Sequence, residues 1–164
     1  MISALPEVAG RAGFSRCGDY RYWLRRCWDP RRPQCAFIGL NPSTADARVD
    51  DPTLRRCIGF AQDWGFGSLL LVNLFSYRCT DPRQLKRVSD PIGSGTTRWI
   101  QRAERESGLV VAAWGNGGAF MFRGRKVLSE LDRPYCLGTT GQGMPRHPLY
   151  CPRDTAPLLL SQTF

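Results

Sequence analysis

The sequence predicts an α/β protein with three layers (α/β/α), in which helices cover both faces of a central, mainly parallel, four-stranded sheet. Three observations support this prediction. Short runs that are apolar throughout recur along the chain, a turn signal follows each of them, and the segments between them have the spacing of amphipathic helices. Runs without polar alternation are typical of strands covered on both faces, and such strands belong to parallel sheets.

The first strand and the first helix of the core follow one another directly. Residues 35–40 form an apolar run, and Pro42 ends it because a proline cannot continue the hydrogen-bond ladder of a buried strand. Two aspartates at 50–51 precede a proline, which is typical of a helix start. This helix is expected to continue to about Trp64, where Gly65 stops it.

The rest of the core repeats this order of strand and helix. Residues 68–73 and 109–114 are two further apolar runs, and residues 135–137 form a last short one. An amphipathic helix is expected over residues 95–106 and another over residues 119–131. The four apolar runs are the four strands of the expected sheet.

The segments outside the core are less regular. Aromatic side chains alternate imperfectly with arginines after residue 14, which predicts an N-terminal antiparallel ribbon over about 14–30. Residues 138–152 are rich in Gly, Pro and Thr and are expected to form a loop. The length fits a single domain, 1–164, with its α/β core at about 35–152.

The charge of the chain points to a polyanionic partner. The formal net charge is +9, and all but two of the 23 Lys and Arg residues are arginine. An excess of this size on a small domain favours nucleic acid, and we expect DNA as the partner. The preference for arginine over lysine has a plainer explanation in the GC content of a genome.

Metal and membrane sites are not expected. The chain has seven cysteines but no CxxC pair, so the spacing of zinc and iron–sulfur ligands is missing and the cysteines are expected to be small core residues. No apolar run approaches the roughly 20 residues of a membrane span, and the N-terminus lacks the pattern of a signal peptide. We expect a cytoplasmic monomer without cofactors.

The candidate site follows from the predicted sheet. Ligands of open parallel sheets bind beside the carboxyl ends of the strands. Asn41 follows the first apolar run, Asn73 ends the second, Asn116 follows the third, and the only histidine, His147, lies in the loop after the fourth. A buried amide such as Asn73 must find partners or lose about 1–3 kcal/mol. These polar side chains are therefore expected to converge on one rim.

Four segments of the chain resemble motifs of the uracil-DNA glycosylase superfamily, in the same order. The run Gly39-Leu40-Asn41-Pro42 resembles the first motif, whose third residue positions the attacking water. Residues 69–73 are similar to a strand that ends in a base-reading asparagine, and residues 110–115 resemble the strand and turn before the third helix. His147-Pro148 resembles the start of a loop that enters the minor groove. More narrowly, the pattern is similar to an uncharacterised bacterial branch of this superfamily.

This resemblance implies a DNA glycosylase of base-excision repair, which hydrolyses the N-glycosidic bond of a flipped, damaged or modified pyrimidine. Asp46 and Asp51 match no motif residue; either is a candidate to activate the water in place of Asn41, and Asp46 is the nearer of the two. The expected site residues are, by role, the catalytic Asn41, His147 and Asp46; the base-binding Gly39, Leu40, Pro42, Ser43, Asn73, Phe75 and Tyr77; and the DNA-binding Arg146, Pro148, Leu149 and Tyr150.

The chemistry of base excision needs these residue types. The base leaves as an anion, so the site must stabilise negative charge on the base and hold a water below C1′. His147 suits the first task and Asn41 the second, although an amide orients water without acting as a base, so a slow enzyme is expected. Asn73 offers the donor and the acceptor that a pyrimidine edge requires. A rim without lysine indicates a monofunctional enzyme, because lyase chemistry needs an amine.

Other interpretations fit the same residues. Asn41 could serve only to form a turn, Asn73 could fix a neighbouring loop by hydrogen bonds, and His147 could have a structural role. A catalytically silent module that binds a modified base or a nucleic-acid end would use the same rim, and a third possibility is an enzyme acting on free nucleosides or nucleotides. Ser43 stands where strict uracil enzymes carry a bulky tyrosine, so we expect a pocket that tolerates 5-substituted pyrimidines.

Overall fold

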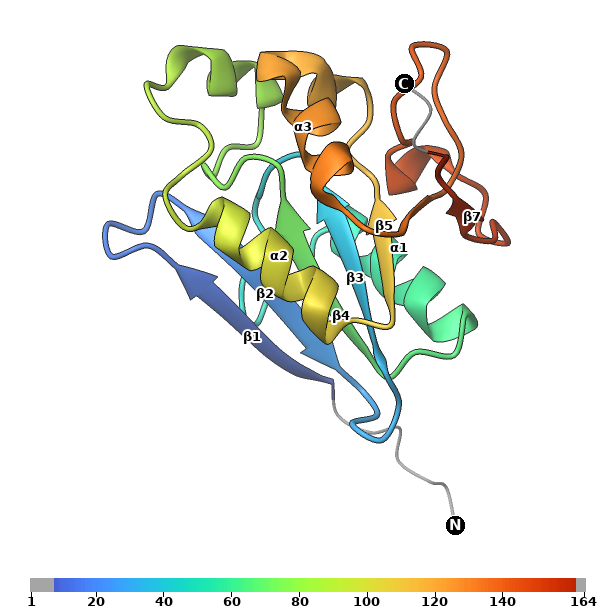
Figure 1. Cartoon of the computed structure of the whole chain (residues 1–164). Coiled ribbons are helices and arrows are strands. Elements are labelled where there is room, and N and C mark those ends of the chain that lie inside the picture. The colour runs from blue at the N-terminus through green and yellow to red at the C-terminus, as the bar shows by residue number, and fades with distance from the viewer. Residues whose placement is uncertain (1–7, 162–164) are drawn as a thin grey trace.

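The computed structural model describes residues 8–161, which form one mixed sheet of seven strands (Figure 1). The strands are β1 (Ala9–Phe14), β2 (Arg21–Cys27), β3 (Gln34–Gly39), β4 (Ser68–Asn73), β5 (Leu109–Ala112), β6 (Pro134–Cys136) and β7 (Leu158–Leu159). Their order across the sheet is β1-β2-β4-β3-β5-β6-β7. Strand β3 pairs in parallel with β4 and β5, and β5 with β6. The pairs β1–β2, β2–β4 and β6–β7 are antiparallel.

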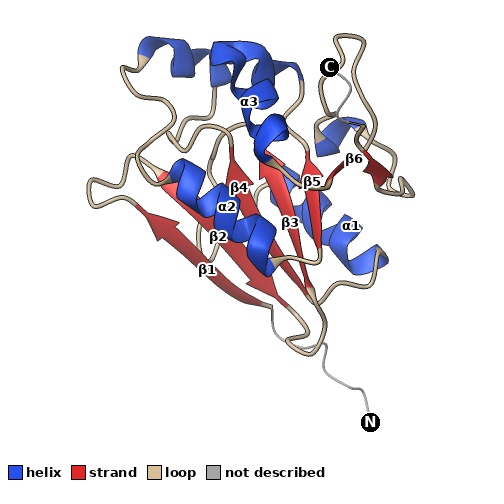
Figure 2. Cartoon of the chain, in the orientation of Figure 1, coloured by secondary structure: helices blue, strands red, loops and turns tan. Residues whose placement is uncertain are grey.

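Helices lie on both faces of this sheet (Figure 2). In the view shown, α2 (Thr96–Glu106) and α3 (Arg123–Glu130) lie in front of the strands, and α1 (Pro52–Asp63) lies behind them. Three short 3₁₀ segments add to these helices: η1 (Pro82–Arg87), η2 (Asn116–Phe122) and η3 (Pro148–Tyr150). None of the helices within residues 8–161 is long and apolar enough to cross a membrane.

The core consists of two apolar clusters, one on each face of the sheet. Ile38 and Val72 belong to the cluster under α2 and α3, whereas Phe37 and Leu71 belong to the cluster under α1. Because successive side chains of a strand point to opposite faces, a strand covered on both sides must be apolar at every position. This is why the apolar runs predicted the strands, and the α/β class is confirmed.

The start and the end of α1 are where the sequence predicts them. Asp51 is the N-cap, and its Oδ1 accepts a hydrogen bond of 2.8 Å from the backbone N–H of Leu54. Pro52 occupies the first turn, where its missing N–H leaves no bond unmade. After the helix, Gly65 has a φ of +86°, a conformation that favours glycine.

Other predictions about the elements need correction. The sheet has seven strands where four and a ribbon were expected, and β1 begins at Ala9, before the expected ribbon. The helix expected over residues 119–131 begins only at Arg123, because Met121 and Phe122 have φ values of +56° and +53°. Just before this turn, Gly118 packs so closely on Trp114 that an added Cβ would lie 2.1 Å from the indole ring.

A glycine substitution tests the packing at the base of the sheet. A Cβ on Gly67 would lie 1.9 Å from the carbonyl oxygen of Asp29, so Gly67→Ala is expected to lower the free energy of unfolding by about 2 kcal/mol or more. Gly59 is the matched control: it lies inside α1 with open space around it, so Gly59→Ala is expected to stabilise the fold by about 0.5–1 kcal/mol. Urea unfolding of the two variants measures both effects, and equal stabilities would contradict this account.

Candidate functional site

The candidate site lies at the carboxyl ends of three neighbouring strands, toward the top of the view in Figure 1. Asn73 is the last residue of β4, and Asn41 follows the end of β3 by two residues. Gly115 follows β5 and lies against His147, since an added Cβ on Gly115 would be 3.6 Å from the His147 Cβ. Adjacent strands are about 4.8 Å apart, so β4 and β5, on either side of β3, are separated by roughly 10 Å. The segments that carry the two amides and the imidazole therefore lie along one edge of the sheet, called the rim below.

Asn73 is a buried amide without a partner. Its side chain lies on the α1 face, in line with Leu71, and only 3% of the residue is exposed. It makes no hydrogen bond with residues 8–161, and its Nδ2 is fully buried. Gly39 lies opposite in the register, and an added Cβ there would come within 2.8 Å of Asn73 Oδ1. The missing side chain of Gly39 is thus what gives the amide its space.

Asn41 is held in one orientation by its own nitrogen. Its Nδ2 donates to the carbonyl oxygens of Pro42 and Cys79 at 3.0 and 2.9 Å, and contacts the Cys79 Sγ at 3.3 Å. The Oδ1 of Asn41 accepts no hydrogen bond from any residue that the structure describes. The amide therefore offers an acceptor of fixed orientation on the rim.

The contacts of His147 define which nitrogen of its ring carries the proton. Its Nδ1 accepts a hydrogen bond of 3.2 Å from the backbone N–H of Leu149, so in the neutral ring Nε2 carries the hydrogen and is a donor. Burial lowers the pKa of His147 below its ordinary value, and the negative charge of Asp51 opposes this effect. A neutral imidazole with an Nε2–H donor is the form expected at pH 7.

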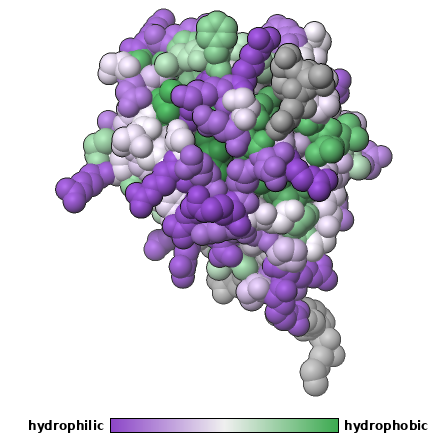
Figure 3. Space-filling model, viewed as in Figure 1, coloured by the Kyte–Doolittle hydropathy of each residue, from purple (hydrophilic) through white to green (hydrophobic). Residues whose placement is uncertain are grey.

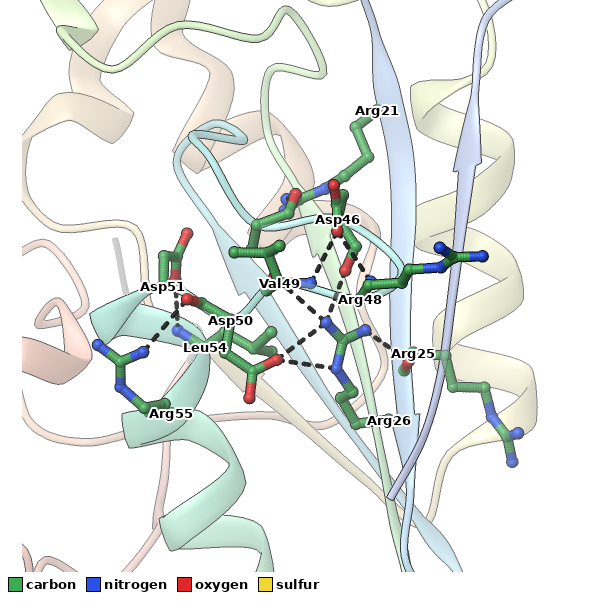
Figure 4. A network of polar contacts seen from close by, with 11 residues as sticks. Arg21, Arg25, Arg26, Asp46, Arg48, Val49, Asp50, Asp51, Leu54 and Arg55 are labelled. Atoms are coloured by element: carbon green, nitrogen blue, oxygen red, sulfur yellow. Dashed lines mark hydrogen bonds and ion pairs between the residues drawn. The ribbon is translucent and has the colours of Figure 1, made fainter. Parts of the chain in front are cut away.

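The loop between β3 and α1 is fixed by two arginines of β2 (Figure 4). Arg26 forms an ion pair of 2.9 Å with Asp50 and donates to the carbonyl oxygen of Asp46 at 2.6 Å. Arg21 donates to the carbonyl oxygen of Ala45 at 2.6 Å, is only 1% exposed, and has a buried Nε without a partner among the described residues. Burial lowers the pKa of Arg21 to about 10, so it remains a cation under the loop at neutral pH.

The carboxylate of Asp46 is engaged by the backbone of its own loop. Its Oδ1 accepts hydrogen bonds of 2.8 and 2.7 Å from the backbone N–H groups of Arg48 and Val49, and these bonds lower the pKa of its carboxyl. The Asp46 side chain thus orders its own turn. Asp51 is the carboxylate whose charge acts on both His147 and Arg21. Its position at the start of α1, directly after the strand–helix loop, was the signal for it.

Two aromatic residues that were expected to stack on the bound nucleobase lie elsewhere. Phe75 is fully buried in the cluster under α2 and α3, and its ring packs against Phe120 at a centroid distance of 5.4 Å. Tyr77 lies at the edge of the same cluster and contacts Tyr20 edge to face. Asn73 lies on the opposite face of the sheet, so the positions of Phe75 and Tyr77 do not support stacking on a base that Asn73 binds.

The remaining expected residues surround the rim. Arg146, Leu149 and Tyr150 are exposed, with 80% of Tyr150 accessible, whereas Pro148 is buried. Ser43 is half-buried in the loop after β3, and Leu40 packs into the cluster under α2.

Within residues 8–161, no group of three or more His, Cys, Asp or Glu side chains is placed to hold a metal ion. All seven cysteines are free; Cys17 is exposed and Cys27 half-buried, contrary to the expectation that all are core residues.

The stability of the fold should depend on the charge of His147. The folded-state pKa lies below the ordinary 6.5, so the unfolded chain binds a proton first as the pH falls. The contribution of neutral His147 to the free energy of unfolding is therefore complete above pH 6.5 and decreases below it. Because His147 is the only histidine, the NMR titration of its ring measures this pKa directly.

Two variants control this prediction. Asp51→Asn should lower the pKa of His147 further, because Asp51 raises it, while asparagine still caps the helix. His147→Asn should remove the loss of stability that this histidine causes below about pH 6.5, measured by urea unfolding. A titration midpoint at or above 6.5 in the native protein would contradict the burial argument.

The fold and the rim define an α/β protein with two amides, a neutral imidazole and a buried arginine gathered where its parallel strands end. The chain belongs to the DUF1643 family, described as a protein of unknown function, whose family model matches residues 21–149. The match contains every candidate site residue except Tyr150, and it leaves out β1 and β7. No curated protein and no solved structure matches the chain.

Proposed function

We propose that the chain is a monofunctional DNA glycosylase resembling the uracil-DNA glycosylase superfamily, which hydrolyses the N-glycosidic bond of a flipped, modified pyrimidine. The observation that carries this proposal is the buried, unpartnered amide of Asn73. An amide without partners costs about 1–3 kcal/mol, so its retention calls for a ligand that supplies them. The edge of a pyrimidine presents an acceptor and a donor side by side, which matches the two groups of an amide.

The other two rim residues suit the remaining steps. The Nε2–H of His147 is a donor for an oxygen of the base, where negative charge accumulates as the bond breaks. The unpaired Oδ1 of Asn41 accepts a hydrogen from the attacking water and so orients it. The water oxygen bonds to C1′, the electron pair of the C1′–N bond leaves with the base, and the water releases a proton to solvent. Without a base at Asn41, the reaction is slow.

The proposal includes the partner and the setting. DNA is bound through the arginine-rich surface of a cytoplasmic monomer, in support of which the chain carries a net charge of +9. Ser43 leaves room beside Asn41 for a substituent on the 5-position of the base. Catalysis runs without a metal or an organic cofactor.

A binding module is the second candidate, and a specific observation favours it. The structure places no carboxylate of residues 8–161 in hydrogen-bond contact with Asn41, the residue proposed to orient the water. A site that recognises a modified base without cleaving it needs the amide and the imidazole but no activated water. The same assay separates the two functions.

Oligonucleotides that each carry one modified base test the proposed function. The protein is incubated with single-stranded and double-stranded oligonucleotides that contain uracil, hypoxanthine, a mismatched thymine or 5-hydroxymethyluracil. Abasic sites are detected by alkaline cleavage. Release of a 5-substituted pyrimidine is the expected result. Tight binding of one of these bases without abasic sites would establish the binding module, and release of base only from free nucleosides would overturn both.

A further inference from the structure

A groove of about 540 Å³ lies along α1, on its solvent side. One wall is the helix itself, where Pro52, Arg55, Arg56 and the residues one and two turns further share a face. The other wall is formed by Leu149 of η3 and by Arg153, which follows η3. Asp63, at the far end of the groove, comes eleven positions after Pro52, which corresponds to about 16 Å along the helix axis.

The groove is lined by three arginines and one carboxylate. Arg55, Arg56 and Arg153 form no ion pair with any residue in the range 8–161, and Asp63 is the single acid that lines it. The guanidinium of Arg56 lies 6.0 Å from the centre of the Phe60 ring, and its buried Nη1 has no partner within the described chain. Several exposed arginines elsewhere are paired, for example Arg31 with Asp29. The groove thus carries an uncompensated positive charge.

The groove begins at the candidate site. Pro52, at its upper end, directly follows Asp51, whose charge acts on His147. Leu149, on the opposite wall, donates its backbone N–H to the Nδ1 of His147. One end of the groove therefore lies beside His147, so a nucleic-acid strand whose base enters at the rim would meet the groove.

We infer that the groove binds the phosphodiester backbone of the DNA strand that carries the target base, on one side of that base. This inference rests on the proposed function, because it takes the rim as the place where the base enters. Guanidinium groups pair with phosphate oxygens through two parallel hydrogen bonds, and phosphate contacts position a strand without reading its sequence. At about 3.4 Å per nucleotide of a stacked strand, 16 Å accommodates roughly five nucleotides.

Binding to a short single-stranded oligonucleotide that carries a tetrahydrofuran abasic-site analogue tests the groove, since this probe cannot be cleaved. Fluorescence anisotropy at several salt concentrations gives the affinity and its salt dependence. The triple variant Arg55→Gln/Arg56→Gln/Arg153→Gln is expected to bind at least about tenfold more weakly, with a salt slope shallower by about 2, since each phosphate contact to a single strand contributes about 0.7.

The control variant removes the same charge from another surface. Arg11, Arg98 and Arg105 are exposed, and none of them makes a side-chain hydrogen bond or an ion pair with the residues described. Two of them lie on α2, over which the surface in Figure 3 is hydrophilic, on the face of the sheet opposite α1. Arg11→Gln/Arg98→Gln/Arg105→Gln should keep the groove-dependent part of the affinity. Urea unfolding of both triple variants, and Arg56→Lys, which keeps the charge, exclude loss of fold as the cause.

Each outcome decides the inference. Greater weakening and a greater change in salt slope for the groove variant than for the control support it. Equal effects of the two triple variants, or no binding of the native protein to the probe, overturn it. The proposed function is judged separately by base release. If the protein binds DNA through the groove but releases no base, the inference about the groove holds and the glycosylase proposal is wrong. If the groove variant excises the base at the native rate, the glycosylase proposal holds and the inference about the groove is wrong.

Discussion

Replacing His147 by alanine is expected to slow base release by about 10²–10³-fold, with little change in the affinity for substrate DNA. The Nε2–H of His147 is placed to stabilise charge that develops only as the glycosidic bond breaks, and removal of one such donor typically has an effect of this size on kcat. Single-turnover rates on the best oligonucleotide of the panel, with affinities from anisotropy, separate the two quantities.

Two further substitutions at this position distinguish catalysis from loop structure. Asparagine places an oxygen near the position of Nδ1 and so preserves the bond from the Leu149 N–H, but it has no group at the position of Nε2. Glutamine reaches further and offers an N–H near that position. We expect His147→Asn to be as slow as alanine and His147→Gln to recover part of the rate. A normal rate for His147→Asn would show that the residue only shapes the loop.

The interior of the fold was predictable because its strands are covered on both faces. Residues 68–73 were predicted as a strand with the bounds that β4 has, since every side chain of this strand is buried. Strand β1 was missed because it lies at the edge of the sheet and contains Gly10 and Gly13, which weaken any strand pattern. Gly13 is required by packing, since an added Cβ would lie 1.9 Å from the Trp23 ring. The contact between Gly13 and Trp23 is visible only in the tertiary structure.

The candidate site was predictable where it depends on strand ends and not where it depends on the loop. Asn41, Asn73 and His147 could be named because each follows or ends an apolar run. Arg21 could not, because its burial results from a loop that folds back over β2 and brings together residues 24 positions apart. The backbone contacts of Asp46 and Asp51 likewise depend on how the loop turns, which the sequence does not show.

Asn73→Leu is expected to stabilise the protein while it abolishes base recognition. Leucine has nearly the shape of asparagine, so the substitution removes a buried amide that has no partner in the described chain and leaves no large cavity. The free energy of unfolding should rise by about 1 kcal/mol. Excision should fall by about 10²-fold or more, because the base edge would then lose its partners on entering the site. Urea unfolding and single-turnover excision measure the two effects on the same preparations.

Gly39→Ala reaches the same amide from the neighbouring strand. Its Cβ would lie 2.8 Å from Asn73 Oδ1, and since no hydrogen bond holds this side chain, the amide is expected to turn away and excision to fall. If both substitutions act through this one group, the double variant Gly39→Ala/Asn73→Leu should be no slower than Asn73→Leu alone. Additive losses would mean that Gly39 contacts the substrate itself, and a destabilised Asn73→Leu protein would mean that the amide has a structural partner, in which case the buried amide no longer supports a ligand.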